Sequence, residues 1–419
     1  MKRIFLAGVL LFSLLFSSCV SHNPPNSSNL MDNVQKSDLA PIEISDPENQ
    51  QANKKVEITD FALNLFRECY EGKNILISPL SIVSALGMTG NGANNETLTE
   101  MEDVLQSDIS DLNNYLKAYT AYCIPSNEGA KVNLTNSIWF KNDEDLTVNK
   151  DFLQTNKDYY NADIYKAPFD AGTKNDINNW VKRETKGMIK DLLKESPSED
   201  TIMYLINALS FDAEWENIYK NTQIRSGEFT LESGEIQTAE FMSSDEYSYL
   251  ENELATGFIK PYKDNKYAFV ALLPKDNTSM SDLLESLDGK SVMGLLENKM
   301  NERVYTKTPK YSVEYGTLLN EPLVRLGMSD AFNRERADFA RLGTYTNENI
   351  FISRVIHKTK IDLDERGTKA GAVTAVEMEC TSGMVDEPKR VILDRPFFYM
   401  IVDTNQNLPL FMGSLMGLD

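Results

Sequence analysis

The stretch Val355-Ile-His-Lys-Thr-Lys-Ile-Asp-Leu-Asp364 decides the fold, because two kinds of side chain alternate along it. One set is uncharged and consists of Val355, His357, Thr359, Ile361 and Leu363. The set that alternates with it consists of Ile356 and four charged residues, Lys358, Lys360, Asp362 and Asp364. Successive side chains of a β-strand point to opposite faces, so the alternation predicts a strand with one buried face. His357 lies on that face, where a hydrogen-bonded core histidine is a better interpretation than a catalytic one.

The 27 residues from Asp364 to Arg390 contain no Leu, Ile, Phe, Tyr or Trp. If the alternation continues, one face presents only small or apolar side chains, and the other presents Lys369, Glu377 and Glu379. The glycines give this segment little stability as a free strand, and Pro388 ends it. Composition alone leaves two interpretations open, a flexible surface loop or a segment that is either an exposed loop or an inserted strand.

The first 19 residues, MKRIFLAGVLLFSLLFSSC, predict a lipoprotein-type signal peptide. Lys2 and Arg3 precede a short apolar run, and the small residues that follow end at Cys19, the expected lipidation site. An ordinary secretory signal with a chance cysteine is the alternative, and both predict export. Residues 20–54 are polar and rich in Asn, Ser and Pro, which predicts a flexible tether.

Composition excludes several classes of function. The chain has 419 residues, 41% of them hydrophobic, and its net charge of -21 would repel nucleic acid. Its four cysteines, Cys19, Cys69, Cys123 and Cys380, have no CxxC spacing, so we expect neither a disulfide framework nor a metal site. With only His22 and His357 available, and no motif of a phosphate-binding loop or a nucleophile elbow, we expect no enzyme and no cofactor.

Periodicity predicts a mixed chain with an α+β arrangement of antiparallel sheets. Helical spacing occurs over 58–70, 74–88 and 178–193, and strand patterns occur over 132–140, 204–211, 266–273, 355–364, 391–402 and 408–414. The segment 74–82 contains Ser78 and Pro79, which are typical of a helix start.

Several blocks of this sequence resemble the serpin family, in that family's order. Glu365-Arg-Gly-Thr-Lys-Ala-Gly-Ala-Val-Thr resembles the hinge of the serpin reactive-centre loop, and Asn74-Ile-Leu-Ile-Ser-Pro-Leu-Ser-Ile is similar to the start of its second helix. Leu205-Ile-Asn-Ala-Leu with Trp215, then Arg395-Pro-Phe and Phe411-Met-Gly, are similar to further family blocks. The resemblance covers about residues 55–419 and implies one domain with a reactive-centre loop at about 365–390. The implied fold is α+β, with a large, mainly antiparallel central sheet, two further sheets and about eight or nine helices.

The resemblance also implies a mechanism of irreversible inhibition by suicide trapping. A serine protease cleaves the exposed loop and forms an acyl-enzyme, and the hinge then inserts into the large sheet as an extra strand. The residues that match the hinge are Glu365, Gly367, Thr368, Ala370, Ala372 and Thr374. Those that match the shutter, the cluster that lets the sheet open, are Ser78, Ser81, Asn207 and His357, and Trp215 matches the breach where insertion starts.

Some residues depart from the family pattern. Arg366 and Lys369 stand where acidic residues are usual, and Val373 is bulkier than the usual alanine. We expect all three to be tolerated, because they would lie on the outward face or outside the inserted core. Before Trp215 the chain reads Phe-Asp-Ala-Glu where the family has Phe-Lys-Gly-x.

The loop is longer than is usual in the family, so two ways of counting give different positions for the cleaved bond. Spacing from Glu365 puts the bond between Thr381 and Ser382, and counting back from Pro396 puts it near Val385, with Met378, Cys380 and Met384 as further candidates. A strand gains roughly 3.3 Å per residue, so cleavage as late as Lys389 would leave slack and make the protein a substrate. None of residues 378–385 is basic, which predicts elastase-like or subtilisin-like targets rather than trypsin-like ones.

Two other functions stay open, inhibition of a papain-like cysteine protease and a non-inhibitory serpin. Bulky, charged or proline-rich hinges would favour the second, and this hinge is built mainly from small residues. We expect a monomer whose partners are proteases and whose only contact with a membrane is the lipid anchor. The expected location is a bacterial cell envelope, on the outer membrane and facing either the periplasm or the outside, or else secretion from the cell.

Overall fold

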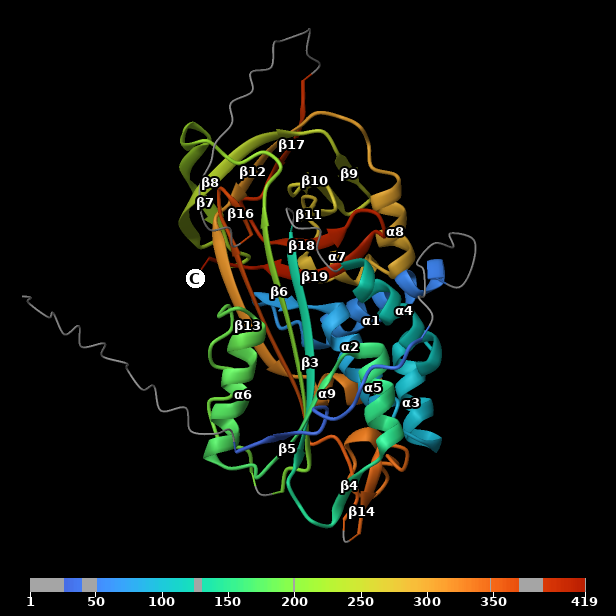
Figure 1. The fold of residues 1–419 in the computed structure, drawn as a ribbon. Helices are drawn as coiled ribbons and strands as arrows, with labels where there is room; N and C mark the ends of the chain where they lie inside the picture. Colours follow the sequence, from blue (N-terminus) through green and yellow to red (C-terminus); the bar gives the residue numbers. More distant parts are fainter. Residues whose placement is uncertain are drawn as a thin grey trace, which may run out of the picture.

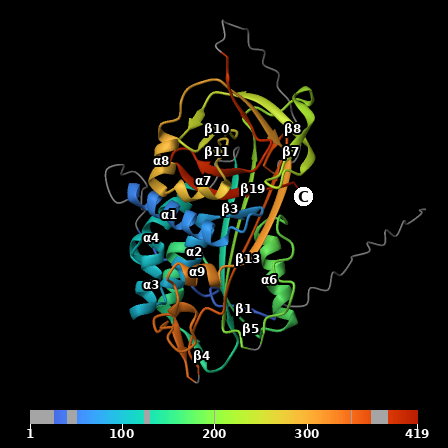
Figure 2. The same cartoon turned by 180° about the vertical axis from the view of Figure 1, so that it is seen from behind.

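In a computed structural model of the protein, the residues described are 26–39, 51–123, 130–198, 200–346, 348–368 and 387–418. They form a seven-stranded sheet, two smaller sheets and a two-stranded pair, with most of the helices gathered beside the long strands of the large sheet (Figures 1 and 2). Both the α+β class and the large, mainly antiparallel sheet with further sheets are confirmed. In this described part of the chain, no helix is long and apolar enough to cross a membrane.

The seven-stranded sheet is the framework of the molecule. Its strands in spatial order are β1 (Ser28–Asn29), β5 (Asp163–Ala167), β3 (Lys131–Lys141), β6 (Met203–Glu214), β16 (Gly367–Thr368), β15 (Arg354–Leu363) and β13 (Tyr311–Leu318). One face packs on the main core, which takes Leu205 from β6 and Val355 from β15. The other face packs under helix α6 (Ala171–Glu184) in a second core that includes Ile206 and Ile356.

The predicted alternation of strand 355–364 is therefore confirmed on one face and incomplete on the other. Val355, His357, Thr359, Ile361 and Leu363 are all buried, as the pattern predicts. Ile356 is buried as well, because α6 covers the second face of the sheet at this point.

The smaller sheets lie toward one end of the long strands (Figure 1). The six-stranded sheet has the order β2 (Ile75–Ile77), β19 (Leu408–Leu415), β18 (Phe397–Asp403), β11 (Tyr267–Pro274), β10 (Ala255–Pro261) and β9 (Tyr249–Glu251). The four-stranded sheet has the order β17 (Lys389–Ile392), β12 (Val304–Pro309), β8 (Ile236–Glu246) and β7 (Ile224–Thr230). The two-stranded pair, formed by β14 (Gly343–Tyr345) and β4 (Leu146–Val148), lies at the opposite end (Figure 1).

One predicted strand is two strands in the structure. We predicted a single strand over 391–402, but β17 ends at Ile392 in the four-stranded sheet and β18 begins at Phe397 in the six-stranded sheet. Pro396 separates them, because a proline has no backbone N–H to donate to a sheet. The predicted strand at 408–414 is confirmed as β19.

The helices in the described residues are α1 (Gln51–Cys69), α2 (Pro79–Gly90), α3 (Asn95–Leu105), α4 (Ile109–Cys123), α5 (Lys150–Tyr160), α6 (Ala171–Glu184), α7 (Met280–Ser286), α8 (Gly289–Glu297) and α9 (Asn320–Arg325). Two short 3-10 helices are η1 (Asn221–Gln223) and η2 (Asp330–Phe332). These nine α-helices of the described chain agree with the eight or nine expected.

Two helix boundaries differ from the prediction. The second helix begins at Pro79, with Ser78 as its N-cap, because residues 75–77 are already paired as strand β2. The helix expected over 178–193 is α6, which begins earlier and ends at Glu184. Gly187 follows at a φ of +80°, a left-handed conformation that favours glycine and ends helices.

The N-terminal segment is held against the domain over residues 26–39, so the predicted flexible tether over 20–54 is wrong for this part. Strand β1 pairs with β5, and the N–H of Leu30 donates to the carbonyl of Ile164 at 2.7 Å. Met31 is only 3% exposed and belongs to the main core, and α1 already begins at Gln51. Average composition misses this arrangement, because one buried methionine and two strand residues are enough to anchor a polar segment.

Met31 should contribute to stability despite its place in a polar segment. We expect Met31→Ala to lower the free energy of unfolding by about 2 kcal/mol, since a buried methionine leaves a cavity. The segment can also detach locally, which limits the loss. Urea denaturation measures this free energy, with Leu39→Ala, at a side chain 40% exposed, as the matched control. Equal effects of the two substitutions would contradict the packing described.

Candidate functional site

Strands β6 and β15 are paired over only part of their length. They run parallel from Arg354 opposite Tyr204 to His357 opposite Asn207. The next link within the described strands is at the other end of β15, where β16 lies between Leu363 of β15 and Ala213 of β6. The sheet is therefore closed up to the His357–Asn207 pair. Beyond this pair, toward Leu363 and Ala213, β6 and β15 no longer pair directly, and the sheet is divided.

The four predicted shutter residues meet at this boundary. The backbone N–H of Ser78 donates to Nε2 of His357 at 3.3 Å, and Nδ1 of His357 lies 2.5 Å from Oδ1 of Asn207. The hydroxyl of Ser81 donates to the same Asn207 oxygen at 3.2 Å. All four residues are completely buried, so the cluster ties α2 to both strands at the point where the sheet divides. Thr359, which was not among the predicted shutter residues, donates a hydrogen bond to the carbonyl of Leu76 at 2.7 Å.

The buried surroundings keep His357 neutral. Burial lowers the pKa of His357 to about 3, and a hydrogen bond with the backbone of Leu76 opposes that shift only in part. The contacts suit one neutral tautomer, in which Nδ1–H donates to Asn207 and Nε2 accepts from Ser78. His357 is thus a structural histidine, and no group in this cluster is placed as a catalytic base.

The first hinge residues are already part of the large sheet. Gly367 pairs with Glu214 and Thr368 with Ala213, so β16 occupies the open end of the space between β6 and β15. Thr368 is 1% exposed, and its hydroxyl lies 2.6 Å from the hydroxyl of Tyr262. A Cβ on Gly367 would come within 2.0 Å of the carbonyl oxygen of Ala213, so only glycine fits this close approach.

Trp215 binds the turn that precedes these residues. Its indole N–H donates to the carbonyl of Asp364 at 2.9 Å, and its backbone N–H donates to the carbonyl of Arg366 at 2.8 Å. The indole stacks on Tyr262, with ring centroids 4.4 Å apart, and is 2% exposed. Trp215, the predicted breach residue, therefore binds backbone carbonyls of the hinge and not the side chains of the loop.

Two ion pairs flank the same turn. The carboxylate of Glu365 lies 2.8 Å from Nζ of Lys310, and this contact lowers the pKa of Glu365 below its usual value. Arg366 lies 2.9 Å from Glu214, the residue before Trp215. This carboxylate explains why a basic residue is accommodated at position 366.

Part of the predicted site lies outside the described residues. This applies to Cys19, to the hinge residues Ala370, Ala372 and Thr374, and to the candidate bond residues Met378, Cys380, Thr381, Ser382, Met384 and Val385. Sequence reasoning missed Tyr262 and Tyr219, which contact Thr368 and Glu365. Tyr262 could not be recognised from the sequence, because its partner Thr368 lies 106 residues away along the chain. Within the described chain, no group of acidic, histidine or cysteine side chains is arranged to hold a metal ion.

Comparison with known proteins assigns this arrangement to a family. The model of the family described as Serpin (serine protease inhibitor) matches residues 56–418. The chain belongs to the serpin family. The crystal structure of the thermophilic serpin tengpin in its native state shares 44% sequence identity and has a TM-score of 0.87, covering 94% of this chain and 100% of tengpin. Tengpin in its latent state, again at 44% identity, has a TM-score of 0.78 and covers 89% of this serpin and 100% of that chain.

Curated sequences give the same family. The leukocyte elastase inhibitor of Equus caballus is 30% identical over 85% of this serpin and 97% of the relative. An uncharacterised serpin-like protein of Thermococcus kodakarensis is 29% identical over 86% of this serpin and 84% of the relative. The serpin fold predicted from the sequence is thus confirmed.

The buried, neutral His357 makes stability depend on pH. Between pH 6.5 and about 3 the unfolded chain binds a proton that the folded ring does not, so the unfolding free energy falls as pH falls. One such residue contributes about 1.4 kcal/mol per pH unit. We expect His357→Gln, which cannot titrate, to show a slope shallower by about that amount between about pH 5.5 and about pH 4.5, where the unfolded histidine is protonated and the folded ring is not. Urea denaturation across this range measures both slopes, and equal slopes would contradict a neutral buried ring.

Proposed function

We propose that this serpin inhibits serine proteases irreversibly and is not itself an enzyme. A protease would cleave the loop that follows Thr368 and form an ester between its own serine and the loop. The hinge-side segment would end in this ester and so stay bound to the protease, while the new N-terminal amine would leave with the C-terminal peptide. The hinge would then extend β16 between β6 and β15 and carry the protease away before water hydrolyses the ester.

The observation that carries this proposal is the position of Gly367 and Thr368. They sit as the first two residues of a strand at the open end of the divided sheet, and β6 and β15 below them are unpaired with each other as far as His357 and Asn207. The residues that would follow into this space, from Ala370 to Ala375, have mostly small side chains. Small side chains let two neighbouring strands separate with little steric cost.

The residues of the loop suggest the class of target. Residues 378–385 contain no Lys or Arg, and their small or medium side chains suit an elastase-like or subtilisin-like protease. The relative from Equus caballus bears the name of an elastase inhibitor, which supports the same class. We propose the bond between Thr381 and Ser382 as the first candidate.

A direct test mixes the chain from Val20 to Asp419 with an elastase, subtilisin and trypsin, followed by denaturing gels and mass spectrometry. The proposal predicts a band that survives boiling with elastase or subtilisin, at the summed mass of the two proteins less the mass of the C-terminal peptide. It also predicts a released C-terminal peptide that begins between Glu379 and Asp386. Cleaved protein without any such band, for every protease, would support the non-inhibitory alternative. A stable complex whose peptide begins at Lys389 or Arg390 would overturn the argument from strand length.

The hinge position Thr368 offers a sharper prediction. Thr368→Arg puts a charge without a partner into a site that is 1% exposed, where burial of an unpaired charge costs about 3–5 kcal/mol. We expect the variant to be cleaved at the wild-type rate but to yield mostly cleaved product in place of complex, because insertion becomes slower than deacylation. Thr344→Arg, at an exposed threonine on β14, is the matched control and should trap normally. An unchanged yield of complex in Thr368→Arg would show that trapping does not pass through this position.

We also propose that the mature protein is a lipid-anchored lipoprotein of a bacterial cell envelope. The support is the sequence of residues 1–19, which ends at Cys19 after an apolar run. In a bacterial expression host, Cys19→Ser should move the protein from the membrane fraction to the soluble exported fraction. If the variant stays with the membrane to the same extent, the anchor is not at Cys19.

A further inference from the structure

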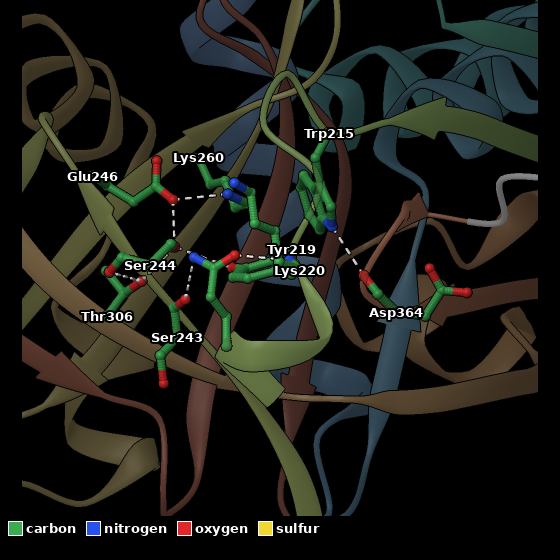
Figure 3. A network of polar contacts seen from close by, with 10 residues as sticks. Trp215, Tyr219, Lys220, Ser243, Ser244, Glu246, Lys260, Thr306 and Asp364 are labelled. Atoms are coloured by element: carbon green, nitrogen blue, oxygen red, sulfur yellow. Dashed lines mark hydrogen bonds and ion pairs between the residues drawn. The ribbon is translucent and has the colours of Figure 1, made fainter. Parts of the chain in front are cut away.

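A charged lysine is buried directly behind the hinge contacts. Lys260 on β10 is 2% exposed, and its ammonium lies 2.8 Å from the carboxylate of Glu246 at the end of β8. The same ammonium lies 4.3 Å from the ring centroid of Tyr219 and 5.4 Å from that of Trp215. Figure 3 shows Lys260 between the carboxylate and the two rings. This cluster of Lys260, Glu246, Tyr219 and Trp215 is called the lysine cluster below.

The lysine cluster connects the three larger sheets. Glu246 also accepts a hydrogen bond from the hydroxyl of Ser244 at 2.6 Å, and that hydroxyl lies 3.1 Å from the hydroxyl of Thr306 on β12. Lys260 belongs to the six-stranded sheet, Ser244 and Thr306 to the four-stranded sheet, and Trp215 directly follows β6 of the seven-stranded sheet. A single buried cation therefore lies where the sheets meet.

The two rings that contact the cation belong to the residues that hold the hinge. The backbone N–H of Tyr219 donates to the carbonyl of Glu365 at 3.0 Å, and Trp215 binds the carbonyls of Asp364 and Arg366. A desolvated cation beside aromatic rings attracts them more strongly than it would in water. The ammonium of Lys260 thus helps to fix the rings of Trp215 and Tyr219. It thereby also helps to fix the backbone N–H groups of these two residues, which donate to the hinge.

Electrostatics agree with a permanently charged lysine. Burial lowers the pKa of Lys260, but the neighbouring Tyr219 and Glu246 more than offset it, so the pKa lies above its usual value. The side chains of Lys260 and Glu246 are 3% and 9% exposed, so the pair is screened little by solvent.

We propose that Lys260 is a positioning residue for the hinge, acting through the rings of Trp215 and Tyr219 to keep residues 364–368 seated at the open end of the divided sheet. This inference rests in part on the proposed inhibitory function, because a seated hinge would shorten the time needed to begin insertion. The seating itself does not depend on any protease. The residue acts through its neighbours and would touch no part of a protease.

Hydrogen exchange measured by mass spectrometry tests the seating without a protease. In Lys260→Met we expect the backbone amides of Trp215 and Tyr219 to exchange about tenfold faster, the effect of losing a desolvated cation–π contact. The matched control is Lys266→Met, because Lys266 also lies over two aromatic rings, but those of Tyr122 and Tyr267 rather than those of Trp215 and Tyr219. The control should leave exchange at residues 214–219 unchanged. Equal exchange in both variants and the wild type would overturn the proposal.

A double variant separates positioning from general destabilisation. Lys260→Met alone leaves the Glu246 carboxylate buried without its partner, which lowers stability by itself. Lys260→Met combined with Glu246→Leu removes both charges and should recover much of that stability. The proposal predicts that exchange at residues 214–219 stays fast in the double variant, because the cation is still missing. If the double variant restored slow exchange together with stability, the unpaired carboxylate alone would explain the effect, and Lys260 would have no positioning role.

Trapping assays then connect the lysine cluster to function. If the wild type forms the boiling-resistant complex, Lys260→Met should give a several-fold larger share of cleaved product, while Lys266→Met should match the wild type. A normal share of complex in Lys260→Met, despite faster exchange, would overturn the functional part of the inference. If the wild type itself formed no complex, the proposed inhibition would fail, and the exchange experiment would still decide the role of Lys260.

Discussion

The hydrogen-bonded pair of His357 and Asn207 is the constraint on which the rest of the structure depends. It is the last position at which β6 and β15 pair directly, and Ser78 and Ser81 at the start of α2 bind the same two side chains. A neutral imidazole suits this place, because it donates at one nitrogen and accepts at the other within a completely buried site. Below the pair the sheet is continuous, and above it the strands are separate.

That division gives the hinge its place. Among the described residues, strand β16 consists of Gly367 and Thr368, and these two residues join β6 to β15 at the end opposite the shutter. Trp215 holds the preceding turn through backbone hydrogen bonds, which do not depend on the side chains of the loop. Within the described residues there is thus one closed end, one seated hinge and, between them, a stretch in which β6 and β15 do not pair with each other. The strand edges along such a stretch are where an additional strand gains the most hydrogen bonds.

The sequence allowed part of this site to be predicted, for reasons that differ from residue to residue. The period of two along 355–363 placed His357 on a buried face, because strand geometry fixes that alternation whatever the fold. Its partner Ser78 lies 279 residues away, and only the resemblance to serpins brought the two together before the structure did. Burial of Ile356 could not be predicted, because it depends on α6 covering the second face of the sheet.

The lysine cluster and the N-terminal segment show why the remainder was missed. Lys260 and Glu246 look like ordinary solvated charges in the sequence, and the only local signal is a lone lysine between Ile259 and Pro261. Met31 lies in a polar segment whose average composition indicates disorder. In both cases a single contact between distant elements outweighs the local pattern, which is why tertiary structure was needed to find it.

The central claim is that the space between β6 and β15 receives the residues after Thr368. The most direct measurement is hydrogen exchange of residues 358–362 and 208–212 before and after a protease cleaves the loop between Met378 and Val385. We expect the amides of these segments that face neither β13 nor β3 to become strongly protected after cleavage, because a new strand would pair with both edges, while the amides around His357 stay protected throughout. Unchanged exchange along both strands after complete cleavage would contradict the account.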